Sequence, residues 1–324
     1  MIDQYFLWPV NKVGRGLASA LKLTPVNRVE QKLQYMFPSG YPVLCSSGRA
    51  ALYFALEESK VNRRDMVGIF PYASHCVIDA VARIGTPFPS PNAVDSNIRI
   101  VYHQWGFVQE TALPANTIED CVDTLCVIGT PLFPGGGNFE VWSLPKIAGT
   151  TSGGVLWCRN EESAIRIRHL RDKRGNGLGQ WLIRLLMKEF PSLYNYWQGA
   201  EAVSGNVSRL QTGEIMSALN NWDILVKDRL EKMSLAWPIT VDWLVMPQNR
   251  LPTVLPVMPD QNISEADLFE LGLTGGFRMI EKLLTNGERT MIKVVPLPIH
   301  YDVRKERLCE LVDVFNMYKN SKRE

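Results

Sequence analysis

The chain has 324 residues, of which 46% are hydrophobic and 21% are charged, and its formal net charge is +2. This composition predicts a globular protein with a large core and more than one domain. The small net charge gives no electrostatic case for binding nucleic acid. No apolar run reaches the roughly 18 residues that span a bilayer, and MIDQYFLWPVNKVGRG does not resemble a secretory signal. We therefore expect a cytoplasmic protein without a membrane span.

The six cysteines and four histidines are scattered along the chain. No two cysteines form a C-x-x-C pair, and most of them lie in apolar segments. This pattern favours free thiols in a reducing compartment over disulfides. The histidines form no H-x-x-x-H motif or mixed cluster with cysteines, so we expect no metal site.

In chain order, the first half alternates short apolar strands with helices. The apolar strands are continuous rather than alternating, which is typical of a parallel or mixed sheet covered on both faces by helices. The expected helices are residues 28–37, a helix that begins near Gly48, and residues 75–84. The expected strands are GYPVLC, residues 66–70, 98–106, 116–129, 139–144 and 153–159.

The second half of the chain does not continue the alternation of strands and helices. Residues 165–174 predict a basic helix, 180–197 an amphipathic aromatic segment, and 208–233 one long helix. The basic helix and the amphipathic segment could lie on a membrane or cover a site entrance, although a packed helix pair is favoured. After residue 238 come expected strands 240–246, 253–259 and 291–299 and helices 264–271, 276–284 and 303–317. We therefore expect a large α/β domain over 1–237 and a small α+β domain over 238–324.

Two segments place polar groups where parallel sheets bind ligands. In SSGRAAL (46–52), Ser47 and Gly48 permit a tight turn from a strand into a helix, whose first N–H groups could bind phosphate. A plain turn is the alternative. In TIEDC (117–121), Asp120 ends an apolar strand and could hold a protonated ring nitrogen at the carboxyl edge of the sheet. A helix cap or turn residue is the alternative.

Two further side chains are candidates for cofactor chemistry. His75 begins a helix in PYASHC (71–76) and could stack on a planar cofactor, or could be a capping or core residue. Lys146 lies between two apolar runs in FEVWSLPKIAGTTSGGVLW, where a buried lysine is rare unless it is paired. A desolvated amine has a lowered pKa and can attack a carbonyl, whereas a solvated lysine would have no such role. A phosphate site, a stacking ring, an aspartate and a lysine are the parts that a pyridoxal phosphate enzyme needs.

Six segments together resemble a known family. The chain resembles the DegT/DnrJ/EryC1/StrS sugar aminotransferases from about residue 28 to about residue 315. The resemblance implies a fold-type I pyridoxal 5'-phosphate (PLP) transferase, with a mostly parallel central sheet between helices. The segments, in the order in which the family has them, are SSGRAALYFAL, IFPYASHCVIDAVARIGTPFP, TIEDCVDTL, FEVWSLPKIAGTTSGGVLW, SGNVSRLQTGEIMSAL and VPLPIHYDVRKE.

The resemblance also implies roles for individual residues. Lys146 would bind PLP through a Schiff base, Asp120 would pair with its ring nitrogen, and His75 would stack on the ring. The phosphate would be bound by the start of the helix near Gly48 and by an asparagine from the partner subunit of a homodimer with shared active sites, and Ser143 could replace the family serine that is absent at position 141. These phosphate-binding residues would be Ser47, Gly48, Arg49, Ala50, Ser143 and Asn206.

The implied reaction is transfer of an amino group, from glutamate, to a keto group of a nucleotide-linked sugar. Family members that act as dehydratases have histidine in place of the lysine, and Lys146 argues against that branch. Two alternatives stay open: a degenerate member with a binding or regulatory role, and another PLP enzyme that acts on a small amino or keto substrate.

The chain also departs from the family pattern. Val141 replaces a phosphate-binding serine, and Arg49 replaces a threonine and could bind phosphate bidentately. Asp123 stands near the position of the cofactor's ring hydroxyl, so we expect it to point away or to have a raised pKa. Residues 108–116 are too short for a crossover helix, because parallel strands need about a dozen residues for one. We therefore expect a loop or a rearranged sheet there, and reduced sugar-binding loops.

Overall fold

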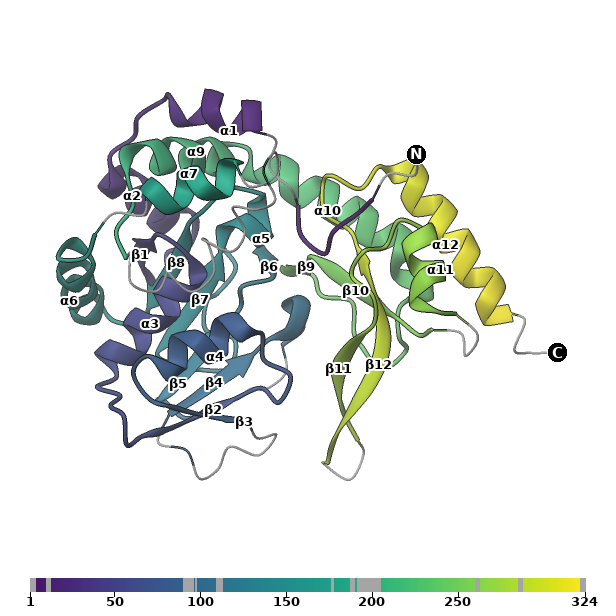
Figure 1. The fold of residues 1–324 in the computed structure, drawn as a ribbon, viewed down its shortest axis with the longest axis horizontal. Helices are drawn as coiled ribbons and strands as arrows, with labels where there is room; N and C mark the ends of the chain where they lie inside the picture. The colour runs from purple at the N-terminus through teal and green to yellow at the C-terminus, as the bar shows by residue number, and fades with distance from the viewer. Residues whose placement is uncertain are drawn as a thin grey trace.

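The computed structural model describes residues 4–9, 13–89, 96, 98–108, 113–175, 178–186, 190, 205–259, 263–284 and 288–320. Figure 1 shows a large α/β part and a smaller part around the C-terminal helix. Among the residues that the structure describes, no helix is both long and apolar enough to cross a membrane.

A seven-stranded sheet forms the centre of the large part. One strand, β8, is antiparallel to both of its neighbours, and the other neighbouring strands pair in parallel. Most residues of β1, β5, β7 and β8 are buried, as expected for strands covered on both faces. In spatial order the strands are β1 (Tyr41–Cys45), β8 (Gly154–Cys158), β7 (Phe139–Ser143), β5 (Thr117–Asp120), β4 (Ile98–Tyr102), β2 (Met66–Ile69) and β3 (Thr86–Pro89).

Helices cover this sheet, and most lie where the periodicity predicts them. The predicted long helix 208–233 is wrong, because the structure has two helices that meet at Asn221. There the Asn221 side-chain amide donates to the carbonyl of Ser217, and such local bonds compete with helix continuation. The helices are α1 (Val13–Ala20), α2 (Val26–Met36), α3 (Gly48–Glu58), α4 (His75–Ala82), α5 (Leu144–Ala148), α6 (Glu161–Asp172), α7 (Leu178–Leu186), α9 (Arg209–Asn220) and α10 (Trp222–Ala236).

The amphipathic segment packs against neighbouring helices. Trp181 and Leu185 of α7 form a buried cluster with Ala20 of α1, and Trp181 Nε1 donates to Glu214 at 3.1 Å. The helix α7 covers residues 178–186, and most of the predicted segment beyond it lies outside the described residues. In the described part, the segment packs against neighbouring helices, and its Leu185 also lines the cavity described below.

The short connection between β4 and β5 leaves the sheet intact. The two strands pair in parallel, with Arg99 opposite Thr117. The described residues of the connection contain the 3-10 turn η1 (Gln104–Gly106). Of the predicted loop 108–116, the described residues 108 and 113–116 form no helix or strand, so the loop is confirmed for these residues, and the sheet is not rearranged. Residues 104–106, expected as the end of a strand, form η1 instead.

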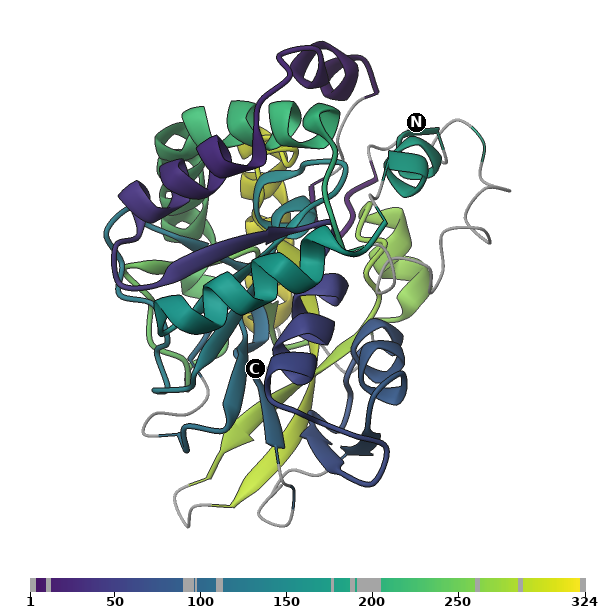
Figure 2. The same ribbon diagram turned by 90° about the vertical axis from the view of Figure 1, so that its left-hand side faces the viewer.

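The C-terminal part has its own antiparallel sheet in the order β10-β12-β11, flanked by two helices. The hairpin of β11 and β12 runs toward the end of the molecule where β2 and β3 lie (Figures 1 and 2). A short ladder of β6 with β9 joins the two parts. These elements are β6 (Thr124–Cys126), η4 (Trp237–Ile239), β9 (Arg250–Pro252), β10 (Val254–Val257), α11 (Glu265–Glu270), β11 (Arg278–Leu283), β12 (Arg289–Pro298) and α12 (Lys305–Asn320).

Two sequence predictions in this part are wrong. The predicted helix 276–284 is wrong, because residues 278–283 form strand β11 instead. Six residues pair with the long strand β12, and this pairing outweighs local propensity. Residues 240–246 form turns after η4, and only Thr240 makes a β-bridge, to Val257. The division at residue 237 stays a prediction, since residues 4–9 also contact the C-terminal part through Tyr5 N and Gly272 O at 2.7 Å.

Candidate active site

A cavity of about 1050 Å³ lies at the carboxyl ends of β4 and β5, where open α/β sheets bind ligands. Its wall includes the loop before α4, the start of α3, the end of β7, helix α5 and the beginning of β11. Within the described part of the chain, Ala50 and Asn206 do not line it. The predicted site residues that do line it are Ser47, Gly48, Arg49, His75, Asp120, Ser143 and Lys146.

Lys146 lies on the short helix α5, and its amine is paired. Its Nζ is 3.0 Å from Asp123 Oδ1, and the side chain is 26% exposed toward the cavity. The amine also lies 4.4 Å from the centre of the Trp8 ring. Burial lowers the pKa of Lys146, but Asp123 and Asp120 outweigh it and raise the pKa above its usual value. The expectation of a lowered lysine pKa is therefore wrong for this structure.

Asp120 ends β5 and is 4% exposed. One carboxylate oxygen accepts a hydrogen bond from the Val122 N–H at 3.2 Å. The pKa of Asp120 is raised to about 7, chiefly by burial and also by Asp123, while Lys146 acts in the opposite direction. A carboxyl group with this pKa can hold or release a proton near neutral pH, and in its charged form it can pair with a protonated ring nitrogen.

The start of α3 forms a compact polar corner of the cavity. Ser47 caps the helix by accepting a hydrogen bond from the Ala50 N–H at 3.0 Å, so this N–H is already used. A Cβ atom on Gly48 would lie 3.2 Å from Ser143 Cβ, so Ser143 lies beside the helix start. A hydroxyl group and a helix N-terminus at one point suit an anion.

Arg49 and His75 line the adjacent wall. The Arg49 side chain is 7% exposed, and its Nη2 lies 2.8 Å from Cys76 Sγ. His75 and Cys76 begin α4, and His75 Nε2 is 3.6 Å from the Cys76 sulfur. The structure thus places a guanidinium group and an imidazole ring at the cavity, next to the start of α3.

The replaced serine position is a buried valine. Val141 is 1% exposed and lies opposite Asp120 in the register of β5 and β7. Residues two apart in a strand face the same side of the sheet, so Ser143 lies on the same side as Val141. Both residues line the cavity. Ser143 therefore provides a hydroxyl group on the side of the strand where the family serine was expected at position 141.

Asp123 is fully buried and directed at Lys146. Its Oδ1 also accepts a hydrogen bond from Trp8 Nε1 at 3.0 Å, and its Oδ2 accepts one from the Tyr102 hydroxyl. Asp123 is not among the residues that line the cavity. The expectation that its carboxylate points away from the bound ring stays a prediction.

Sequence reasoning missed several residues of this site. Tyr102 could have been found, because it ends β4 directly opposite Asp120 and parallel strands end at one edge. Trp8 has no local signal, because residues 4–9 reach the site only through tertiary contacts. The same holds for the C-terminal residues at the cavity, which are Phe277, Arg278, Met279 and Lys293.

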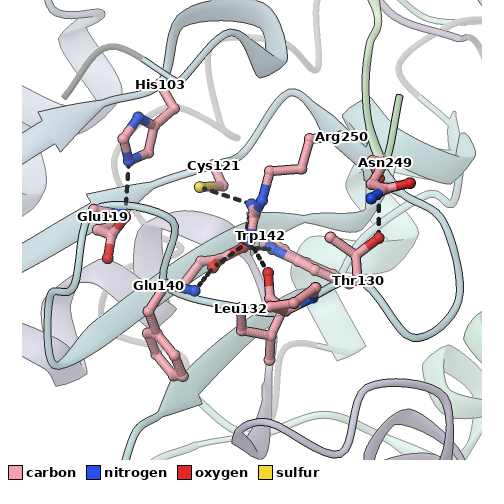
Figure 3. Close-up of polar contacts among 12 residues, drawn as sticks. His103, Glu119, Cys121, Thr130, Leu132, Glu140, Trp142, Asn249 and Arg250 are labelled. Carbon is pink, nitrogen blue, oxygen red and sulfur yellow. Dashed lines mark hydrogen bonds and ion pairs between the residues drawn. The ribbon is translucent and has the colours of Figure 1, made fainter. Parts of the chain in front are cut away.

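Buried polar contacts support the strands that carry the site (Figure 3). Glu140, next to Val141 in β7, binds Arg250 of β9 through two N–O contacts of 3.0 Å. Glu119, next to Asp120, binds His103 at 2.9 Å. Glu119 also accepts hydrogen bonds from the N–H groups of Gly135 and Gly137. These contacts hold β5 and β7 in register behind the cavity.

Asn206 lies away from the cavity of its own chain. Its backbone N–H donates to Gly175 O at 3.3 Å, and its Oδ1 accepts from the Val207 N–H at 2.8 Å. Its expected role in a partner's site stays a prediction.

Comparisons with known proteins show the family to which the chain belongs. A family model described as "putative PLP-dependent aminotransferase" matches residues 29–316. The chain therefore belongs to this family of PLP-dependent aminotransferases. The enzyme class, the cofactor and the fold-type I architecture expected from the sequence are confirmed.

Solved structures share the fold at low sequence identity. A "putative sugar aminotransferase Spr1654" from Streptococcus pneumoniae has a TM-score of 0.68 and 13% identity, with 97% of each chain covered. A DegT DnrJ EryC1 StrS aminotransferase from Brucella abortus has a TM-score of 0.60 and 13% identity, covering 94% of this chain and 95% of that one. DesI has a TM-score of 0.65 and 13% identity, covering 98% and 93%. No curated protein matches the chain by sequence.

Proposed function

We propose that this protein is a PLP-dependent aminotransferase that delivers an amino group, taken from glutamate, to a keto group of a nucleotide-linked sugar. The main support for this proposal is that Lys146 and Asp120 line the same cavity as the start of α3. The substrate class is supported by DesI, whose structure was determined in the presence of its TDP-sugar product.

The residues of the cavity fit the cofactor. A side chain at Gly48 would crowd Ser143, so the glycine keeps the start of α3 close to β7, and the N–H groups of this helix start suit an anion. The Lys146 amine is accessible from the cavity, and Asp120 lies at the strand end on the same wall. Bound PLP would supply an aldehyde carbonyl that an amine can attack and an electron-accepting ring.

The protein's own groups then have separate tasks. Lys146 would hold the cofactor and, once free, move a proton between carbon atoms of the bound molecules. Asp120 would keep a proton on the ring nitrogen, which suits its position at the end of a buried strand. Ser47, Gly48, Arg49 and Ser143 would bind the phosphate, and His75 would cover the ring.

Absorption spectroscopy tests this proposal. Purified protein mixed with PLP should gain a visible absorption band that borohydride removes and that Lys146→Ala lacks. Lys227→Ala is the matched control, since Lys227 is exposed on α10 and should leave the band intact. Glutamate should then bleach the band, and a keto sugar nucleotide should restore it. A wild-type protein without the band would exclude the proposal and favour a degenerate family member.

We also infer a homodimer in which Asn206 completes the partner's phosphate site. The placement of Asn206 outside its own cavity supports this. Subunit mixing tests it: Lys146→Ala and Asn206→Ala chains, each impaired alone, should form mixed dimers with one undamaged site and regain activity. Mixed dimers that regain no activity would place Asn206 outside the shared site.

A cytoplasmic location is part of the same proposal. All six cysteines are free, and four of them are buried, which suits a reducing compartment.

A further inference from the structure

The buried carboxylate of Asp123 depends on Lys146 for its charge balance. Asp123 has no exposed surface, and its two oxygens receive Lys146 Nζ, Trp8 Nε1 and the Tyr102 hydroxyl. A buried charge is strongly destabilising unless it is paired and hydrogen-bonded. Of these three groups Lys146 carries the positive charge, so the amine and the carboxylate hold each other in place.

Trp8 covers this ion pair from a distant part of the chain. Residues 4–9 are held to the C-terminal part by Tyr5 N and Gly272 O at 2.7 Å, and by His300 Nε2 and Phe6 O at 2.8 Å. From there the indole N–H reaches Asp123, and the ring face lies 4.4 Å from the amine. An aromatic face stabilises an ammonium ion more than a neutral amine.

The other groups around the amine also favour its charged form. Asp120 at the end of β5, Tyr102 at the end of β4 and Cys76 at the start of α4 line the same wall. Burial opposes the charge on Lys146, while Asp123, then Asp120 and then Cys76 favour it and raise its pKa. Asp123 is the group in direct contact, at 3.0 Å.

We infer that Asp123 is a positioning residue that determines when Lys146 becomes a nucleophile. It holds the amine as an ammonium ion against Trp8 in the cavity wall, and an amine attacks a carbonyl only after it has lost its proton. The inference rests on the proposed function, because it concerns the lysine that would bind PLP. Its test uses the protein without cofactor and is therefore independent of that function.

Competitive labelling of lysines measures this effect directly. Cofactor-free protein is treated with trace acetic anhydride between pH 7 and 10.5, and peptides carrying Lys146 and Lys227 are quantified by mass spectrometry. In Asp123→Asn, the apparent pKa of Lys146 taken from the labelling curve should fall by about one unit or more. Lys146 should then be labelled at least about tenfold faster at pH 9 than in the wild type. The labelling of Lys227 in the same sample should not change. Equal labelling of Lys146 in both proteins would overturn the inference.

Two further variants keep the test decisive. Asp123→Ser removes the charge without added bulk and replaces Asp123→Asn if that variant does not fold. Tyr102→Phe removes a hydrogen bond to Asp123 but keeps the charge, so labelling of Lys146 should change much less than in Asp123→Asn. If Tyr102→Phe accelerates labelling as much as Asp123→Asn does, packing rather than charge is responsible and the inference fails. The PLP spectrum of the wild type, recorded separately, reports on the proposed function alone.

Discussion

Glu140 of β7 and Arg250 of β9 form a buried bidentate ion pair, with both N–O distances at 3.0 Å. Glu140 also accepts hydrogen bonds from Trp142 Nε1 and the Phe133 N–H. The pair joins the strand that carries Val141 and Ser143 to the ladder that leads into the C-terminal part. The position of the cavity wall therefore depends on it.

Breaking this pair should destabilise the whole protein. Arg250→Met leaves the Glu140 charge buried and unpaired, so the free energy of unfolding should fall by about 3–5 kcal/mol. Urea denaturation at pH 7 measures this change. The double variant Glu140→Gln/Arg250→Met should be less destabilised than Arg250→Met alone. If the double variant has a lower free energy of unfolding than either Arg250→Met or Glu140→Gln alone, the expected coupling is contradicted.

The same pair predicts loss of stability in acid. Burial raises the pKa of Glu140, but Arg250 and the hydrogen bonds outweigh it and lower the pKa below its usual 4.5. A carboxyl group with a lowered pKa contributes stability above its unfolded pKa, and this contribution is lost as the pH falls through the folded pKa. Unfolding midpoints measured from pH 7 down to pH 3 should therefore fall less steeply in Glu140→Gln/Arg250→Met than in wild type.

Gly149 ends the helix of Lys146 in a conformation that a side chain would strain. Its φ is +65°, and a Cβ atom there would lie 2.1 Å from the Tyr301 hydroxyl oxygen. Gly129 has a φ of +83° with nothing within 4 Å of such an atom. Gly129→Ala should therefore lower the free energy of unfolding by about 1–2 kcal/mol, and Gly149→Ala by about 1–3 kcal/mol more. Equal losses in thermal denaturation would show that Tyr301 moves aside freely.

Asp120 should lower the stability of the cofactor-free protein. Burial raises its pKa from 3.8 to about 7, so the folded protein binds an extra proton between these values and loses stability as the pH rises through them. Asp120→Asn removes this loss. The variant should gain stability on the order of 2–4 kcal/mol at pH 8 and less at pH 5, while its aminotransferase activity falls. Urea denaturation at both pH values measures this gain in the free energy of unfolding. An equal gain at pH 5 and pH 8 would show that it does not come from the raised pKa of Asp120.

Ser143 should contribute to phosphate binding in place of the absent serine at position 141. A hydrogen bond to a charged group contributes about 1.5–3 kcal/mol, so Ser143→Ala should weaken PLP binding about 10–100-fold by fluorescence titration. Val141→Ser in that background should restore part of the affinity, because both side chains lie on one side of β7. Unchanged affinity in Ser143→Ala would mean that the start of α3 and Arg49 bind the phosphate without it.

Local sequence determined much of the site because its main parts lie at strand ends. SSGRAAL contains its own turn and helix cap, and TIEDC and FEVWSLPK are buried strands that end in polar residues. Such signals depend on neighbours in the chain, and strands paired in parallel then bring Tyr102, Asp120 and Val141 to one edge. The order of these motifs was enough to predict the α/β fold and the candidate lysine.

Tertiary structure alone decided what surrounds that lysine. The charge state of Lys146 depends on Asp123, whose partners come from β4 and from residues 4–9. Strand β11 exists because it pairs with β12, and its start then supplies part of the cavity wall. Electrostatic interactions and strand pairing depend on distance in space rather than on separation in the chain. The sequence therefore predicted the candidate amine, and the fold places this amine in an ion pair with the buried Asp123.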